Sequence, residues 1–316
     1  GALTRLSLGG SLRTNTFTTP RISNLAKDVT FDFATSADTT TASVAAGDLT
    51  LRLGSKKEIA ALTAQLQRLA SELMRQAGNY ELDQERLKTF LPTLSFYLDA
   101  GRDNPLYNIA RIKGYSFHSA YINLNTDPRQ GMSGDARISA LKMGALLLDS
   151  IRANIVQDST GVQLYALVKN GQKNPTPLEV RCKSYVLPTG AGLELKYLDS
   201  EGQTGVDLGV RAELAEGGLQ VRLFPEHPVL AYRSFKLNKD NFVFLGKDKS
   251  IRADIDLLAD DGTGLKIYGE PRDSMNDLTV SVNQLNLGEL STVLPYLPRF
   301  TGMLSGDIHV TNDTLH

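Results

Sequence analysis

The side chains best suited to acid–base or metal chemistry are few and scattered along the sequence. No pair of histidines has a metal-binding spacing such as HxxxH. The four histidines are His118, His227, His309 and His316. His309 falls in a predicted strand out of phase with Ile308 and Val310, so we expect it on the solvated side. The histidines therefore predict neither a metal site nor a catalytic base.

An acidic stretch, Asp254, Asp256, Asp260, Asp261 and Gly262, is faintly similar to a calcium loop, but it lacks the register of an EF-hand. No GxGxxG, Walker or GxSxG motif occurs, and no serine has the setting of a nucleophile elbow. We therefore predict that the protein is not an enzyme and has no cofactor. A hydrolase is an alternative, and it would require a clustered acid–base pair in a pocket.

Length and charge limit the classes of partner. The chain has 316 residues, enough for one large β domain or two smaller ones, with 34 basic and 35 acidic residues and a net charge of −1. No summed field draws it to nucleic acid or to an anionic membrane surface. The single cysteine, Cys182, excludes an internal disulfide, and its phase with Leu178 and Val180 predicts an inert buried thiol.

Membrane targeting must come from outside this sequence if it exists at all. No apolar run reaches the ~18 residues of a spanning helix, and no signal peptide is recognisable. The first residue is Gly1 rather than methionine, which we interpret as the remnant of a tag on an excised segment. A membrane anchor is then expected in parts of the protein that precede this segment.

The clearest structural signal is an amphipathic hairpin in the second half of the chain. Residues 206–214 and 219–223 alternate between apolar and polar side chains, and Glu216-Gly217-Gly218 reverses the chain between them. One face of the hairpin is therefore apolar and the other polar.

Similar strands account for most of the remaining sequence. Residues 1–54 predict a β segment of three or four strands, and residues 115–316 predict an antiparallel β-meander with a short helix near 286–294. Residues 55–114 predict a helical insert. In this insert the capping-box spacing from Ser55 to Glu58 predicts the first helix, Asp83 begins a second, and Asn104 with Pro105 begins a third.

The apolar strand faces need a cover that the three predicted helices are too small to supply. Burial contributes roughly 25 cal/mol per Å², so a bare face in water is unfavourable. Two sheets could pack as a sandwich, one sheet could close into a barrel, or a curled sheet could hold an apolar ligand. The candidate groove-lining residues are Leu193, Leu195, Val206, Leu208, Val210, Leu219, Val221, Leu223, Ile151 and Ile155. The pattern alone favours ordinary sandwich core for these residues, because most one-sided sheets are covered by protein.

The sequence from Leu285 to Val310 resembles a family unit. A short helix pattern with Leu285, Leu287 and Leu290, then Pro295 and Pro298, precedes Gly302-Met303-Leu304-Ser305-Gly306-Asp307-Ile308-His309-Val310. This is similar to the xxGxLxGxxxV unit of the TamB family (translocation and assembly module subunit TamB) within the AsmA-like superfamily. Residues 100–106, 148–158 and 235–241 look like the Bacteroidetes-type version, so the likeness extends over most of the chain.

The resemblance implies a mainly β fold, a large curled antiparallel sheet forming a groove (a β-taco), here with a short helical insert. It also implies a periplasmic segment anchored in the inner membrane that carries phospholipid acyl chains towards the outer membrane. An outer-membrane barrel of the Omp85 type is an implied partner. An alternative function is a scaffold or chaperone that holds outer-membrane protein strands by β-augmentation at its sheet edges.

Overall fold

The computed structural model describes residues 5–13, 16–19, 22–25, 28–272, 275–293 and 300–313. The protein is mainly β, with an antiparallel sheet of 21 strands, a separate two-stranded hairpin and few helices. The chain forms two compact units. Unit 1 comprises Gly1–Arg75 with Asp83–Asn174, and unit 2 comprises Gln76–Leu82 with Pro175–His316.

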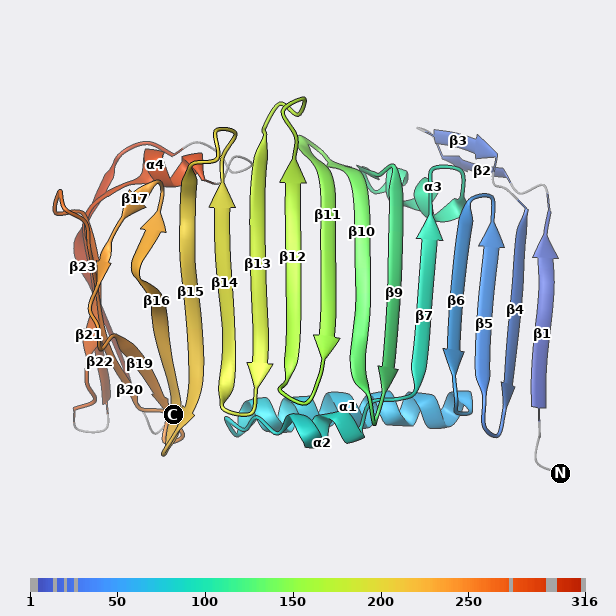
Figure 1. Ribbon diagram of the computed structural model, residues 1–316, viewed down its shortest axis with the longest axis horizontal. Coiled ribbons are helices and arrows are strands. Elements are labelled where there is room, and N and C mark those ends of the chain that lie inside the picture. Colours follow the sequence, from blue (N-terminus) through green and yellow to red (C-terminus); the bar gives the residue numbers. More distant parts are fainter. Residues whose placement is uncertain are drawn as a thin grey trace. The chain divides into compact units, whose positions relative to one another are not determined.

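Unit 1 contains an open antiparallel sheet in which each strand pairs with its neighbours in the order β1, β4, β5, β6, β7, β9, β10, β11 and β12 (Figure 1). Helices α1 and α2 connect β6 to β7, and α3 lies between β7 and β9. Its strands are β1 (Arg5–Leu12), β2 (Thr16–Thr19), β3 (Ile22–Leu25), β4 (Val29–Ser36), β5 (Thr40–Ala46), β6 (Leu49–Ser55), β7 (Leu94–Ala100), β8 (Tyr115–Ser116), β9 (Ser119–Asp127), β10 (Gly131–Met143), β11 (Leu146–Gln157) and β12 (Val162–Asn170). Its helices are α1 (Ile59–Gly78, of which residues up to Arg75 belong to this unit), α2 (Gln84–Thr89) and α3 (Pro105–Ile112).

Unit 2 continues the same hairpin design. Its strands are β13 (Leu178–Leu187), β14 (Gly190–Leu198), β15 (Thr204–Ala215), β16 (Gly218–Leu230), β17 (Arg233–Ser234), β18 (Lys236–Leu237), β19 (Phe242–Gly246), β20 (Ile251–Leu258), β21 (Gly264–Gly269), β22 (Met275–Asn286) and β23 (Met303–Asp313), with α4 (Leu287–Thr292) before the last strand. The predicted hairpin is β15–β16, in which Leu214 pairs with Leu219 across a two-residue loop. Gly217 adopts a φ of +80° there, a conformation that favours glycine.

The mainly β, antiparallel prediction is confirmed, but the strong curl is not present. Among the described strands of unit 1 no pairing joins β1 to β12, and in unit 2 none joins β13 to β23, so neither sheet closes. Sheets bend sharply where bulges shift the register. The pairing from β4 to β9 runs without such shifts, whereas β14–β15, β15–β16 and β22–β23 of unit 2 contain them.

Two predictions for the 55–114 insert need correction. The insert contains a strand, β7, which pairs with β6 and β9 inside the sheet and so interrupts the helices. Ser55 is the last residue of β6, not a helix cap, and α1 begins four residues later at Ile59. Strand pairing with Leu94 and Thr40 holds Ser55 in the sheet, which overrides the local capping pattern.

The other two helix starts follow the predicted chemistry. The Asp83 side chain accepts a hydrogen bond from the Arg86 amide at the start of α2. The Asn104 side chain accepts one from the Tyr107 amide at the start of α3, with Pro105 in the first helical turn. Helix α4 and strand β23 lie where the predicted terminal helix and strand were expected, while Gly1, Pro295, Pro298 and His316 fall outside the described residues.

Candidate functional site

Strand pairing in unit 1 aligns apolar side chains in continuous rows on one face. Directly paired residues of an antiparallel sheet point to the same side. One row is Leu8, Phe33, Ala42, Leu53, Phe96 and Leu124. The next is Phe31, Val44, Leu51, Leu98, Ile122, Ala136, Ala153 and Ala166. We call this surface the apolar face of unit 1.

The candidates Ile151 and Ile155 lie on this face. Ile151 pairs with Ile138 and Val168, and Ile155 pairs with Gly134 and Leu164. Both side chains are partly exposed, as are the members of the two rows from Phe31 to Ala166. The described protein therefore does not bury this face as it would a core.

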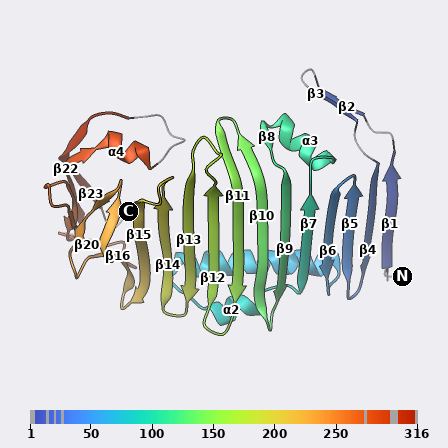
Figure 2. The ribbon, with the colours of Figure 1, turned by 45° about the horizontal axis from the view of Figure 1, so that its top comes forward.

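Helix α3 covers one end of the apolar face. Leu106 and Tyr107 of α3 pack against a cluster in which Leu49, Ala100 and Phe117 are buried. Figure 2 shows α3 at the ends of β7 and β9. The packed cluster reaches Val44 and Leu98 of the second row. Phe33, Leu53 and Phe96 of the first row are partly exposed.

A carboxylate contact near the surface holds the α3 loop in place. Asp48 in the β5–β6 turn accepts hydrogen bonds from the Asn104 Nδ2 atom at 2.6 Å and from the Asp103 amide at 3.1 Å. Burial raises the pKa of Asp48, but these hydrogen bonds outweigh burial and keep the pKa below its ordinary value. Asp48 is therefore ionised at neutral pH.

The start of α1 is attached to the opposite end of the same face. Thr40 Oγ1 donates to the Lys57 carbonyl at 2.7 Å, so Thr35 Oγ1 must donate to Thr40 Oγ1 at 3.0 Å. Thr35 Oγ1 in turn accepts the Ile59 amide at 3.1 Å. Thr35 is two residues after Phe33, so it shares the apolar face, and both threonines are buried.

Only part of the predicted apolar stripe of α1 is buried in the described protein. Leu62 is buried, and Gln65 donates from Nε2 to the Leu91 carbonyl. Ile59, Leu66 and Leu73, spaced seven residues apart, are exposed, Leu73 by 49%. A row of large apolar side chains thus extends along α1 without a partner among the described residues.

The opposite face of unit 1 is polar and internally paired. Arg52 pairs with Tyr97 across β6 and β7, and Tyr121 pairs with Arg137 across β9 and β10. Tyr97 pairs with Asn123, so the two tyrosines are diagonal neighbours on β7 and β9. The two tyrosine rings meet edge to face at 5.7 Å, and each guanidinium lies over the nearer ring. This face has its own stabilising contacts and needs no further cover.

The other eight groove candidates lie in unit 2, on the apolar face of its hairpins. Leu195 pairs with Leu208, and Leu193 pairs with Val210, which pairs with Leu223. Val206 pairs with Tyr197, Leu219 with Leu214, and Val221 with Ala212. Leu193 is 46% exposed and Leu195 is 39% exposed, so the β14 side of this face is open to solvent.

Part of the unit 2 face is ordinary core rather than open surface. Phe235 is buried with Ile255, Leu257 and Ala259, and Leu223 and Leu230 pack against this cluster. Leu223 is therefore partly covered by protein. Cys182, which we predicted to be buried, is partly exposed beside its paired residue Leu195.

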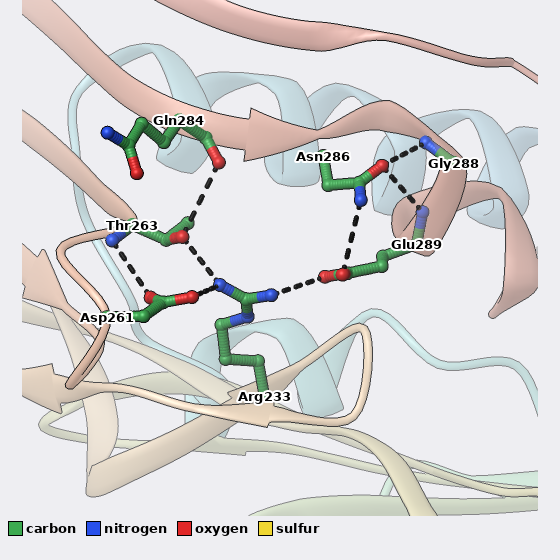
Figure 3. A network of polar contacts seen from close by, with 7 residues as sticks. All are labelled: Arg233, Asp261, Thr263, Gln284, Asn286, Gly288 and Glu289. Carbon is green, nitrogen blue, oxygen red and sulfur yellow. Dashed lines mark hydrogen bonds and ion pairs between the residues drawn. The ribbon is translucent and has the colours of Figure 1, made fainter.

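An ion-pair network in unit 2 attaches α4 to the sheet (Figure 3). Arg233 binds the carboxylate of Asp261 and, through Nη2, that of Glu289 at 2.8 Å. Arg233 Nη1 also donates to Thr263 Oγ1 at 2.6 Å. The three residues lie 28 or more positions from Arg233 in the sequence, and no local pattern in the sequence indicates this network.

The acidic stretch has partners of its own. Asp256 pairs with Lys266 at 2.8 Å, and Asp261 is bound by Arg233. Among the described residues no group of three or more histidine, cysteine or acidic side chains could hold a metal ion. His309 Nδ1 lies 3.0 Å from Thr279 Oγ1, a contact between paired residues on β22 and β23.

Comparisons with protein-family models, curated proteins and solved structures found no match for this chain. Within the described part of the chain, no helix has both the length and the apolar character required to span a bilayer.

Proposed function

We propose that this segment shelters phospholipid acyl chains on its apolar sheet faces, as part of an envelope protein that supports lipid transport and outer-membrane biogenesis. The observation that carries the proposal is the apolar face of unit 1. This face is continuous across paired strands, and its side chains stay partly exposed to solvent. A face of this kind requires an apolar cover. Acyl chains supply one without sequence-specific contacts.

Dimensions support the same occupant. Strand β6 has 7 residues, which at ~3.3 Å per residue gives the face a depth of roughly 20 Å. One leaflet contributes about half of the ~30 Å hydrocarbon core of a bilayer. An acyl chain lying along the strands therefore fits between the ends covered by α3 and α1.

The resemblance to the TamB family supports the setting. It favours the periplasm as location, an inner-membrane anchor outside this segment and an Omp85-type barrel as partner. An open, weakly curled sheet departs from the strongly curled β-taco, so the groove we propose depends on lipid and α1 to complete its wall.

Site-specific photo-crosslinking in cells tests the proposal. A photoreactive residue at Leu208 or Val221, on the apolar face of unit 2, is expected to give phospholipid adducts. The matched control is Gln220, which neighbours Val221 but points to the opposite face. Equal adduct yields at Val221 and Gln220 would exclude transport along this face.

A second candidate function is a scaffold that holds outer-membrane strands by β-augmentation. Among the described strands β23 pairs only with β22, and Met303, Leu304, Ile308 and Val310 on it are exposed. An exposed strand edge can pair with another chain. This function predicts protein adducts from photoreactive residues in β23, whereas lipid adducts alone would dismiss it.

A further inference from the structure

A polar pocket lies at the end of the unit 1 strands where α1 begins. It has a volume of about 510 Å³ and is lined at the ends of β5, β6, β7, β9, β10 and β11. Hydroxyl and amide side chains predominate in its lining, with one ammonium group from Lys56 and one carboxylate from Asp127. The lining therefore consists mainly of hydrogen-bonding groups and suits a polar group that can donate hydrogen bonds.

Two buried oxygen atoms in this pocket have no hydrogen-bond partner among the described residues. They are Ser55 Oγ and Gln157 Oε1, on side chains that are 7% and 9% exposed. A buried polar group without a partner is unfavourable, and such groups are rare in folded proteins. Because an amide oxygen only accepts, Gln157 Oε1 requires a donor from outside the chain.

Register places both oxygens at the border of the apolar face. Ser55 follows Leu53 by two residues, and Gln157 follows Ile155 by two, so each side chain points to the apolar side. Leu94 and Met132 line the same pocket. The surface therefore changes from apolar to polar along the strands. An amphiphile lying on it would place its chains on the apolar part and its headgroup in the pocket.

We infer that this pocket binds hydrogen-bond-donating headgroups of glycerophospholipids whose chains lie on the apolar face. The inference rests on the proposed function and adds the headgroup class to it. Ser55 and Gln157 are four strands apart, roughly 19 Å at ~4.8 Å per strand, so the pocket has room for headgroups side by side. A glycerol headgroup donates hydroxyl protons to these oxygens, and its phosphate pairs with Lys56; choline has no donor.

The test compares lipid uptake from two kinds of vesicle. The whole chain is incubated with phosphatidylglycerol or phosphatidylcholine vesicles and re-isolated, and the bound lipid is counted. One neutral hydrogen bond corresponds to roughly a fivefold preference, so we expect about fivefold more phosphatidylglycerol. The double variant Ser55→Ala, Gln157→Met is expected to remove the preference while still binding both lipids.

Controls separate this inference from folding effects and from the proposed function. Ser43→Ala with Gln163→Met, on the opposite face, is expected to keep the preference. Equal uptake of both lipids by the unmodified chain overturns the headgroup site alone, and no uptake of either overturns the proposed function as well. Free glycerol 3-phosphate that binds with the same sensitivity to the double variant would show that the site serves a soluble polyol, which contradicts the inference.

The lipid-free protein provides an independent readout. Because Ser55→Ala removes an unpartnered hydroxyl, the thermal midpoint of the variant is expected to stay the same or to rise. A clear fall would mean that Ser55 has a structural partner, which would overturn its role in the pocket.

Discussion

The single thiol of the chain reports on the apolar face of unit 2. Cys182 is partly exposed and pairs with Leu195, which is itself open to solvent. Acyl chains on this face would shield the thiol from a charged reagent. We expect a charged thiosulfonate to label Cys182 several-fold faster after detergent removes bound lipid, with the rate followed by mass spectrometry. Equal rates before and after delipidation would contradict a lipid cover at this position.

In unit 1, acid should weaken the contact between the Asp48 carboxylate and the α3 loop. Its pKa is lowered in the folded protein, so its contribution to stability is complete above the ordinary value of 3.8 and is lost as pH falls through the lower folded value. Asp48→Asn cannot make this charge-assisted contact at any pH. We expect the variant to be less stable at pH 7 and to lose less stability than the unmodified chain as pH falls below about 4.

Circular dichroism melts across that pH range measure this difference. Asp38→Asn, in the exposed β4–β5 turn, serves as the control because this carboxylate accepts a local hydrogen bond from the Ser36 hydroxyl and lies away from α3 in the sequence. Parallel pH profiles for Asp48→Asn and the unmodified chain would show that the carboxylate does not hold α3.

Among the elements, α1 depends on a hydrogen-bond relay that begins in β4. Thr35→Val leaves the Ile59 amide and the buried Thr40 hydroxyl each with one partner fewer. We expect a loss of about 1–2 kcal/mol in the free energy of unfolding. Thr41→Val, an exposed position on the adjacent strand, is expected to change stability little. A similar loss in both variants would disprove the relay.

Shortening a buried and an exposed leucine side chain of α1 should change the free energy of unfolding by different amounts. Leu62 is buried, so Leu62→Ala is expected to cost about 2–4 kcal/mol. Leu66 is exposed, so Leu66→Ala should remain within about 0.5 kcal/mol of the unmodified chain while reducing lipid uptake. Chemical denaturation followed by circular dichroism separates the two. Equal costs would show that the whole stripe is core.

Element types could be predicted because the local signals were strong. Alternation identified β15 and β16, and capping residues identified the starts of α2 and α3. The start of α1 was misplaced because a sheet contact, not a local cap, fixes it. β7 was missed because its pairing partners β6 and β9 lie on both sides of it in the sequence, and its short run stood among helix signals.

For the whole molecule, alternation predicted an apolar face but not its cover. Pairing register alone decides that Phe33, Leu53 and Phe96 share a row, and register depends on contacts distant in sequence. The Phe235 cluster and the Arg233 network could not be predicted either, because their partners meet only in the folded chain. The polar pocket could not be predicted since its two unpartnered oxygens lie about a hundred residues apart.

The most direct test of lipid binding is the amount of phospholipid that co-purifies with the chain. Ile151→Glu with Ile155→Glu places charge on the apolar face, whereas Arg152→Glu with Asn154→Glu places it on the polar face of the same strand. We predict that the unmodified chain and the polar-face variant carry diacyl phospholipid, counted by mass spectrometry of the extract, and that the apolar-face variant carries little. A lipid-free unmodified chain, or equal lipid in the two variants with both folded, would contradict the proposed function.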